Sequence, residues 1–360
     1  MPPNSALQLA YSWMKAPLVA SAPMLDIASA PLAVSVSAAG GLGFLAGGFD
    51  VSSLESNLEE AVQLIKQSDT AIQQNYARSG ILPIGVGFLN WGADLPQSIA
   101  AIEKYRPCAA WLFGARNIPD DLRPWVEHVR VVSDGKTKIW VQIGTVAEAV
   151  AVAEALDPDI LVVQGSDAGG HGLAQSASII TLVPEVRDAL AARQLKREIP
   201  LVAAGGIVDG RGIAASLALG AAGAVMGTRF LASEEAKIAR GYQNEVLRAS
   251  DGGVSTVRST VYDRVRGMLS WPTRFDGRGV INRSYVDAVE RGVSDEENRA
   301  LYEEELKKGD LGWGPDARLT TYAGTGVGLV RETLPAANIV ANVIRETRNT
   351  LQHLKVEIRE

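Results

Sequence analysis

The chain has 360 residues, of which 47% are hydrophobic and 21% charged, and its net charge is −6. This composition can bury a large core in one big domain with an elaboration, and its acidic balance argues against a nucleic-acid or anionic-membrane partner. A single cysteine, Cys108, excludes a disulfide framework, and no apolar run approaches 18 residues, so we expect a cytoplasmic protein without a membrane span.

Short apolar runs alternate with helix-like segments along the first two-thirds of the chain, the pattern of repeated βα units around a parallel sheet. Several runs end in glycine or another small residue, where a loop would open. Eight strands are expected, which is the number that closes a TIM (β/α)8 barrel. They are Pro17–Ala22, Leu42–Ala46, Leu82–Phe88, Ala109–Phe113, Lys138–Ile143, Asp159–Gln164, Pro200–Ala204 and Ala224–Gly227.

Amphipathic helices are predicted between these strands. Apolar spacing predicts one over Ser53–Gln74, and another over Thr145–Ala155 begins with a threonine cap followed three residues later by Glu148. A further helix is expected over Pro335–Leu354, where it would return to pack on the barrel.

The segment 232–320 breaks the βα rhythm. It is richer in charged residues, aromatic residues and glycine, and it shows no clean strand pattern. We interpret it as a lid-like, mainly helical subdomain added after the eighth strand. The expected organisation of this α/β protein is a barrel over 1–231, the lid over 232–320 and a returning segment over 321–360.

An open doubly wound sheet is the competing architecture, because Gly41-Leu-Gly43-Phe-Leu-Ala46 superficially matches the dinucleotide-binding pattern G-x-G-x-x-A. In that fold the glycines open a helix after the first strand. Here they precede or lie within the second strand, so we favour the barrel.

The ends of three strands carry residues suited to a planar heteroaromatic ligand. Ala22, Pro23 and Met24 close the first strand with small residues and a polarizable side chain that can lie flat against a ring system. Gln142 and Gln164 end the fifth and sixth strands, and an amide can donate to and accept from a ring edge. Ordinary strand-to-helix turns are the alternative interpretation.

The segment from Gln164 to Gly172 is the most informative of the chain. Gly169 and Gly170 let the backbone approach a ligand closely, and the following His171 is one of three histidines and offers a base that titrates near neutrality. A lone histidine can equally be a satisfied structural residue. We expect a catalytic loop at the carboxyl end of a buried strand.

The seventh and eighth strands end in glycine motifs, which is where barrels bind phosphate through backbone N–H groups. Tight turns alone would also explain such glycines. No CxxC, HExxH or clustered His/carboxylate spacing indicates a catalytic metal. The residues expected to face a phosphate-bearing cofactor are Gly205, Gly206, Gly227 and Thr228, the last two in the motif Val225-Met226-Gly227-Thr228.

These motifs, in this order and spacing, resemble the nitronate monooxygenases, formerly called 2-nitropropane dioxygenases, and most closely their fungal-type class I members. The resemblance spans nearly the whole chain. It rests on Ala22-Pro-Met24, the segment Gly40–Gly48, Gln164-Gly-Ser-Asp-Ala-Gly-Gly-His171, Ala203-Ala-Gly-Gly-Ile207, Met226-Gly-Thr-Arg-Phe230, Asp251-Gly-Gly253 and Tyr322-Ala-Gly-Thr-Gly-Val-Gly328.

The resemblance implies a TIM barrel that holds non-covalent FMN, with His171 as the catalytic base. It also implies FMN contacts from Gln164, Gly169, Gly206 and the run Val225-Met-Gly-Thr228. This sequence departs from many bacterial members at Gly87, where they carry asparagine, and at Val225, where they carry glutamine.

The implied activity is oxidation of nitronates by O2 to a carbonyl compound and nitrite, with nitroalkanes entering after proton abstraction by His171. A substrate that is already a nitronate needs no base, and His171 would then position it. Two alternatives remain open: an FMN-dependent enoyl-thioester-type reductase using NAD(P)H, and a flavin-binding protein without turnover. The oligomeric state and the physiological substrate are left open.

Overall fold

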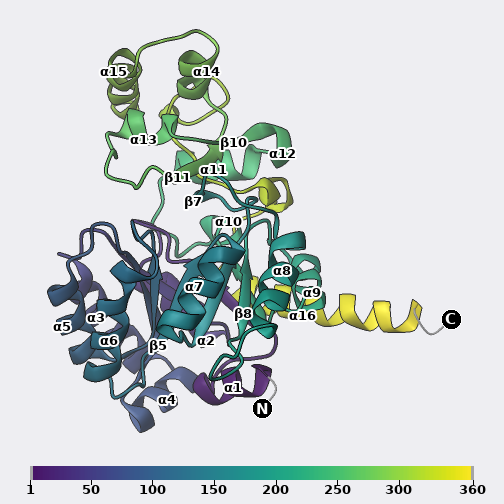
Figure 1. Cartoon of the computed structure of the whole chain (residues 1–360). Helices are drawn as coiled ribbons and strands as arrows, with labels where there is room; N and C mark the ends of the chain where they lie inside the picture. Colours follow the sequence, from purple (N-terminus) through teal and green to yellow (C-terminus); the bar gives the residue numbers. More distant parts are fainter. Residues whose placement is uncertain (1–2, 358–360) are drawn as a thin grey trace.

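The computed structural model describes residues 3–357 and contains one eight-stranded parallel sheet in the order β1-β9-β8-β6-β5-β4-β3-β2. The sheet curls into a nearly closed barrel (Figure 1), and each of the eight predicted strands is found within two residues of its expected ends. The strands are β1 Leu18–Ser21, β2 Phe44–Gly48, β3 Leu82–Leu89, β4 Pro107–Phe113, β5 Lys138–Ile143, β6 Ile160–Gln164, β8 Leu201–Ala204 and β9 Gly223–Met226.

The barrel closes between β1 and β2 through a single bridge, Ala20 to Leu42. The buried hydroxyl of Ser21 reinforces this closure by accepting a hydrogen bond from the Phe44 N–H at 3.2 Å. Inside the barrel, the Phe44 ring packs edge-on against Trp111, with 5.0 Å between centroids. The interior is therefore filled by side chains, and open space can form only at the ends of the strands.

Helices cover the outside of the barrel. The predicted helix over Ser53–Gln74 is in fact two helices, because the backbone is extended at Ser68 and Thr70, whose hydroxyls bond each other at 2.6 Å. The helices are α1 Pro3–Ala10, α2 Ala30–Ala38, α3 Leu54–Gln67, α4 Ala71–Ser79, α5 Leu95–Tyr105, the 3-10 turn η1 Asp120–Leu122, α6 Arg123–Val132, α7 Val146–Leu156, α8 Ile179–Ala191, α9 Gly210–Ala218 and α10 Thr228–Leu231.

The segment 232–320 sits over one end of the barrel (Figure 1) and consists mainly of short helices. It also contains two strands that the sequence pattern did not reveal, since one is only four residues long and the other is rich in glycine and charged residues. Its elements are α11 Arg240–Arg248, α12 Gly252–Ser255, β10 Thr256–Ser259, α13 Val261–Arg266, β11 Phe275–Val280, α14 Arg283–Val289, α15 Asp295–Leu306 and η2 Gly309–Gly312.

We had expected the glycine-rich segment around His171 to be a loop, but part of it is a strand. Residues Gly170–Leu173 form strand β7, which joins β10 and β11 in a three-stranded antiparallel sheet of order β10-β11-β7. A barrel segment and the lid thus share one small sheet.

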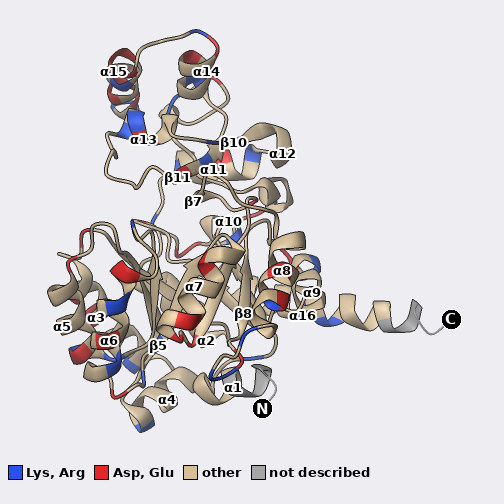
Figure 2. Cartoon of the chain, viewed as in Figure 1, with Lys and Arg blue, Asp and Glu red and all other residues tan. Residues whose placement is uncertain are grey.

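The chain returns to the barrel after the lid. A short turn, η3 Thr325–Leu329, precedes α16 Ala336–Glu357, which overlaps the predicted C-terminal helix and packs on α9 and α2. Its buried residues include Ile339, Val340 and Val343. None of the described helices is both long and apolar enough to cross a bilayer. Acidic and basic side chains are interspersed on the outer helices and on the lid (Figure 2).

The glycines of the candidate dinucleotide-binding pattern serve close packing between the first two βα units. A Cβ on Gly43 would lie 1.8 Å from the Ala33 carbonyl oxygen of α2, and one on Gly41 would lie 2.9 Å from the Val19 oxygen of β1. No helix begins at these glycines, because the chain continues into β2. The doubly wound alternative is therefore wrong.

Replacing Gly43 with alanine should lower the free energy of unfolding by about 3 kcal/mol or more, because the added methyl group overlaps backbone that cannot withdraw. Gly253→Ala is the matched control, since a Cβ there meets nothing within 4 Å. Urea unfolding of both variants measures the effect. Equal unfolding midpoints for Gly43→Ala and the control would contradict this packing argument.

Candidate active site

A cavity of about 600 Å3 opens at the carboxyl ends of the barrel strands, between the barrel and the lid. Thirteen of the fourteen predicted site residues line it. The exception is Met226, which is fully buried in β9 outside the cavity, because alternate residues of a strand face opposite sides and its neighbours Val225 and Gly227 face in. Those that line it are Ala22, Pro23, Met24, Gln142, Gln164, Gly169, Gly170, His171, Gly205, Gly206, Val225, Gly227 and Thr228.

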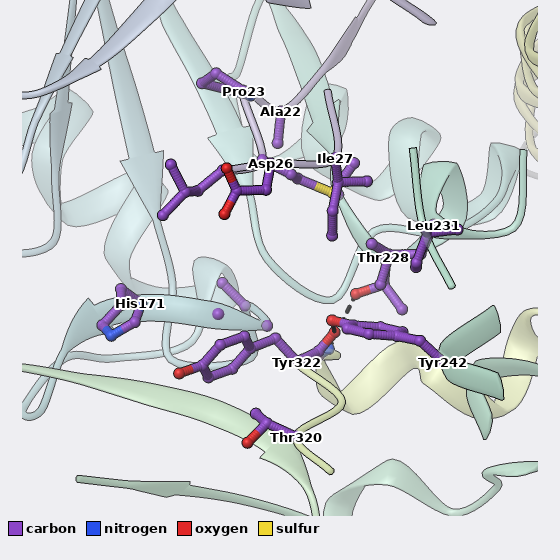
Figure 3. A pocket seen from close by; sticks show the side chains of 18 of the residues that line it. Ala22, Pro23, Asp26, Ile27, His171, Thr228, Leu231, Tyr242, Thr320 and Tyr322 are labelled. Atoms are coloured by element: carbon purple, nitrogen blue, oxygen red, sulfur yellow. Dashed lines mark hydrogen bonds between the residues drawn. The ribbon is translucent and has the colours of Figure 1, made fainter. Parts of the chain in front are cut away.

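The lid and the returning chain form the opposite wall of the cavity. Figure 3 shows Tyr242, Thr320 and Tyr322 across the space from Ala22 and Ile27. Further lid residues on this wall are Val265, Arg266, Met268, Trp271, Tyr302 and Trp313. The end of the barrel that carries the strand-end motifs is thus the end that the lid covers.

His171 is held from two directions by lid residues that our sequence reasoning did not single out. Its Nε2 lies 2.9 Å from Oδ1 of Asp263 in α13, and both side chains are at most 10% exposed. The indole of Trp271 stacks on the imidazole with centroids 3.8 Å apart and planes 5° apart. Asp263 carried no sequence signal, because it is one of many acidic residues in a charged segment.

Tyr322 completes this cluster. Its hydroxyl donates to the same Oδ1 of Asp263 at 2.9 Å. Burial, together with the neighbouring Asp263 carboxylate, raises the pKa of Tyr322 well above its usual value, so the phenol keeps its proton and donates. Tyr322 lies in a segment that contributes to the family resemblance, but no pattern assigned it this contact.

Strand β7 is fixed in place by side chains from the barrel and the lid. The Gln164 amide nitrogen donates to the His171 carbonyl at 3.1 Å. One of its N–H groups therefore binds protein backbone and is not available to a ligand. The buried guanidinium of Arg258 donates to the carbonyls of Ala168 and Asp276 at 2.8 and 2.7 Å. Burial lowers the pKa of Arg258. Together these bonds tie the glycine-rich segment to the lid sheet.

The glycines near β7 differ in what they require. A Cβ on Gly169 would lie 2.4 Å from backbone atoms of Ala323 and Gly324, so packing alone explains this glycine. A Cβ on Gly170 would meet nothing within 4 Å, although its φ of +66° favours glycine.

The two strand ends expected to face phosphate present unpartnered backbone donors. Gly205 and Gly206 have φ values of +109° and +74°. Within residues 3–357, no acceptor bonds the N–H groups of Gly205, Gly206, Gly227 or Thr228. The Thr228 hydroxyl accepts from the Gly324 N–H at 2.9 Å, which leaves its own proton free to donate. Such convergent donors can bind an anion.

Gly227 is a glycine that the protein's own packing does not require. A Cβ there would come no closer than 3.7 Å to any protein atom, and the backbone φ of −103° suits any residue. Packing and backbone conformation therefore give no reason for glycine at this cavity-lining position. A ligand lying against the backbone would explain the glycine, because a side chain there would occupy the ligand's space. The residues present therefore fit a phosphate-bearing group.

Gln142 and Gly87 also line the cavity. The Gln142 amide oxygen accepts from the Trp111 indole N–H at 3.0 Å, which leaves its amide N–H groups as the donors available to a ring edge. A Cβ on Gly87 would lie 2.4 Å from the Pro23 ring, so no asparagine side chain fits where many bacterial members carry one.

Comparison with known proteins gives one consistent result. The sequence profile described as "Nitronate monooxygenase" matches residues 123–346. The chain is 49% identical over 348 residues to the nitronate monooxygenase npaC of Metarhizium robertsii, covering 96% of this chain and 94% of that protein. It is 35% identical over 367 residues to the nitronate monooxygenase of Neurospora crassa, covering 98% and 95%.

Solved structures agree on the fold. The nitroalkane oxidase of Streptomyces ansochromogenes superposes with a TM-score of 0.72 at 24% identity, covering 97% of this chain and 99% of that chain. FabK of Thermotoga maritima superposes with a TM-score of 0.69 at 21% identity, covering 98% of both chains. At these identities the likeness shows a shared fold and not a shared reaction.

The clamp formed by Arg258 yields a stability prediction. Arg258→Gln should lower the free energy of unfolding by about 3 kcal/mol, because it removes a largely buried guanidinium and leaves Asp276 and two partly buried carbonyls without their charged donor. Arg193→Gln, which breaks a half-exposed pair with Glu154, should change it by less than about 0.5 kcal/mol. Urea unfolding measures both, and equal losses would contradict a specific role for the clamp.

Proposed function

The chain belongs to the nitronate monooxygenase family, which consists of flavin-dependent oxidoreductases, and we propose that it binds FMN and uses O2 to oxidise nitronates to a carbonyl compound and nitrite. The observation that carries the proposal is the cavity itself. It brings the partly buried His171 and two glycine strand ends with unpartnered N–H groups into one space.

FMN would be held by residues of the barrel. The donors of Gly205, Gly206, Gly227 and Thr228 would bind its phosphate. We find no second nucleotide-binding motif for the adenine half of FAD within residues 3–357. The ring system would lie near Ala22, Pro23, Met24, Gln142 and Gly170. When bound, FMN supplies the electron-transfer chemistry that amino-acid side chains lack.

His171 would act on the substrate as a base. A carbon next to a nitro group is acidic, and neutral imidazole can accept its proton, which converts a nitroalkane into the nitronate. The lid and barrel walls keep this step in a space lined largely by apolar side chains. A substrate that arrives as a nitronate skips this step, and His171 then only orients it.

The cofactor assignment is tested on the purified protein. Heat should release FMN and not FAD, and chromatography of the supernatant identifies it. Gly227→Ala should lower the FMN content several-fold while leaving the unfolding midpoint of the flavin-free protein unchanged, because its added methyl group has room in the protein but not beside a ligand. Gly253→Ala is the control for the substitution itself. Release of FAD, or full FMN content in Gly227→Ala, would contradict the assignment.

The base assignment is tested with two substrates. His171→Asn removes the base while keeping approximate size, so kcat/KM for nitroethane should fall roughly 10²–10⁴-fold. The value for ethylnitronate should fall much less. Both are measured as oxygen consumption at matched FMN content, with a parallel assay of NAD(P)H oxidation by an enoyl thioester. Equal losses for both substrates would remove the base role, and NAD(P)H turnover would favour the reductase alternative.

A further inference from the structure

The contact between His171 and Asp263 joins two parts of the chain that are 92 residues apart. His171 lies in β7, whereas Asp263 lies in α13 of the lid. Asp263 is 5% exposed, and its Oδ1 receives both the His171 ring and the Tyr322 hydroxyl at 2.9 Å. A buried carboxylate that accepts two hydrogen bonds on one oxygen is part of a defined polar network, unlike an exposed ion pair.

The chemistry of this contact fixes which imidazole nitrogen bears the proton. An ionised carboxylate can only accept hydrogen bonds, so Nε2 of His171 must be the N–H donor to Asp263. The neutral ring then carries its lone pair on Nδ1. Among the described residues Nδ1 has no hydrogen-bond partner, and it is not one of the fully buried unpartnered atoms. Nδ1 is therefore not sealed off by protein, and it belongs to a side chain that lines the cavity.

We propose that Asp263 is a positioning residue that holds His171 as the Nε2–H tautomer, with Nδ1 as the proton-accepting atom, and that stabilises the imidazolium formed when substrate is deprotonated. This inference rests on the proposed role of His171 as a base. Trp271 supports it by fixing the plane of the ring, since the two rings are nearly parallel at 3.8 Å.

The proton and charge balance of the step is complete. The C–H bond next to the nitro group breaks, its electron pair forms the C=N bond of the nitronate, and the negative charge resides on the nitro oxygens. The proton forms a new N–H bond at Nδ1. His171 then carries a positive charge between the Asp263 carboxylate and the Trp271 face. Asp263 takes no proton and remains a carboxylate.

The lid therefore contributes to the chemistry as well as to the wall of the cavity. Asp263 and Trp271 are eight residues apart in one lid segment, between β10 and β11. Displacing this segment would free the imidazole to rotate and to take up either tautomer. A base that is aligned only when the lid is seated would deprotonate substrate only inside the closed cavity.

Nitrogen-15 NMR tests the inference without relying on turnover. The chain has three histidines, so labelled histidine gives few signals, and the His171 signals are those missing from His171→Asn. At pH about 9, above the usual titration range of histidine, the wild-type shifts should show Nε2 protonated and Nδ1 unprotonated. A wild-type His171 ring protonated at Nδ1 would overturn the inference even if Asp263→Asn does not fold.

The variant Asp263→Asn should shift His171 toward the other tautomer and lower kcat for nitroethane by roughly 10- to 1,000-fold. KM for nitroethane and kcat for ethylnitronate should change by less than about threefold. Asp295→Asn is the matched control. Asp295 is a lid carboxylate in α15 that pairs with Arg264 of α13, and it does not line the cavity. This variant should leave tautomer and kcat unchanged.

These outcomes separate the two proposals. If His171→Asn keeps nitroethane turnover, the base role fails whatever Asp263 does. If His171→Asn loses turnover but Asp263→Asn keeps the wild-type tautomer and kcat, only the role of Asp263 fails. Parallel losses for nitroethane and ethylnitronate in Asp263→Asn would mean that Asp263 merely supports the fold.

Discussion

The site depends on the antiparallel pairing of β7 with β11. In this pair His171 of β7 stands opposite Gly277 of the lid strand β11. The register of the two strands therefore sets where His171 lies relative to the lid. A slip by one residue would turn the imidazole to the other face of the sheet, away from Asp263 and Trp271. Arg258 and Gln164 hold the register from outside the pair by binding backbone carbonyls on β7 and just before it. The position of the histidine is therefore decided by the lid and barrel together.

Glycine makes this small sheet possible, for reasons that differ along it. A Cβ on Gly277 would lie 2.6 Å from the Tyr322 ring, and one on Gly172 would lie 2.7 Å from the Gln164 amide oxygen. The absence of a side chain at Gly277 leaves room for the Tyr322 ring, whose hydroxyl bonds Asp263. Much of the glycine richness that suggests ligand binding is thus a packing requirement, whereas Gly227 has no such protein contact.

The barrel could be predicted from the sequence because its signals are local. Each parallel strand is an apolar run buried on both faces, and each ends in a recognisable turn. Alternation along β9 would also have excluded Met226 from the cavity. In contrast, β11 reads Phe-Asp-Gly-Arg-Gly-Val, which has little intrinsic strand preference and forms a strand because partners lie on both sides. The contact of Asp263 with His171 is equally non-local, so no spacing rule could reveal it.

The way the lid leaves and re-enters the barrel explains how it can contact His171 without disturbing the barrel. Ser233 pairs with Leu334 in a parallel bridge, and the Glu234 N–H donates to the Leu334 carbonyl at 3.1 Å. The insertion therefore departs and returns at neighbouring points, after which α16 packs on α9 and α2 to complete the last βα unit. Barrel closure does not depend on the internal structure of the lid. Lid sequence can then vary to change the wall of the cavity, provided that α13 still delivers a carboxylate to His171.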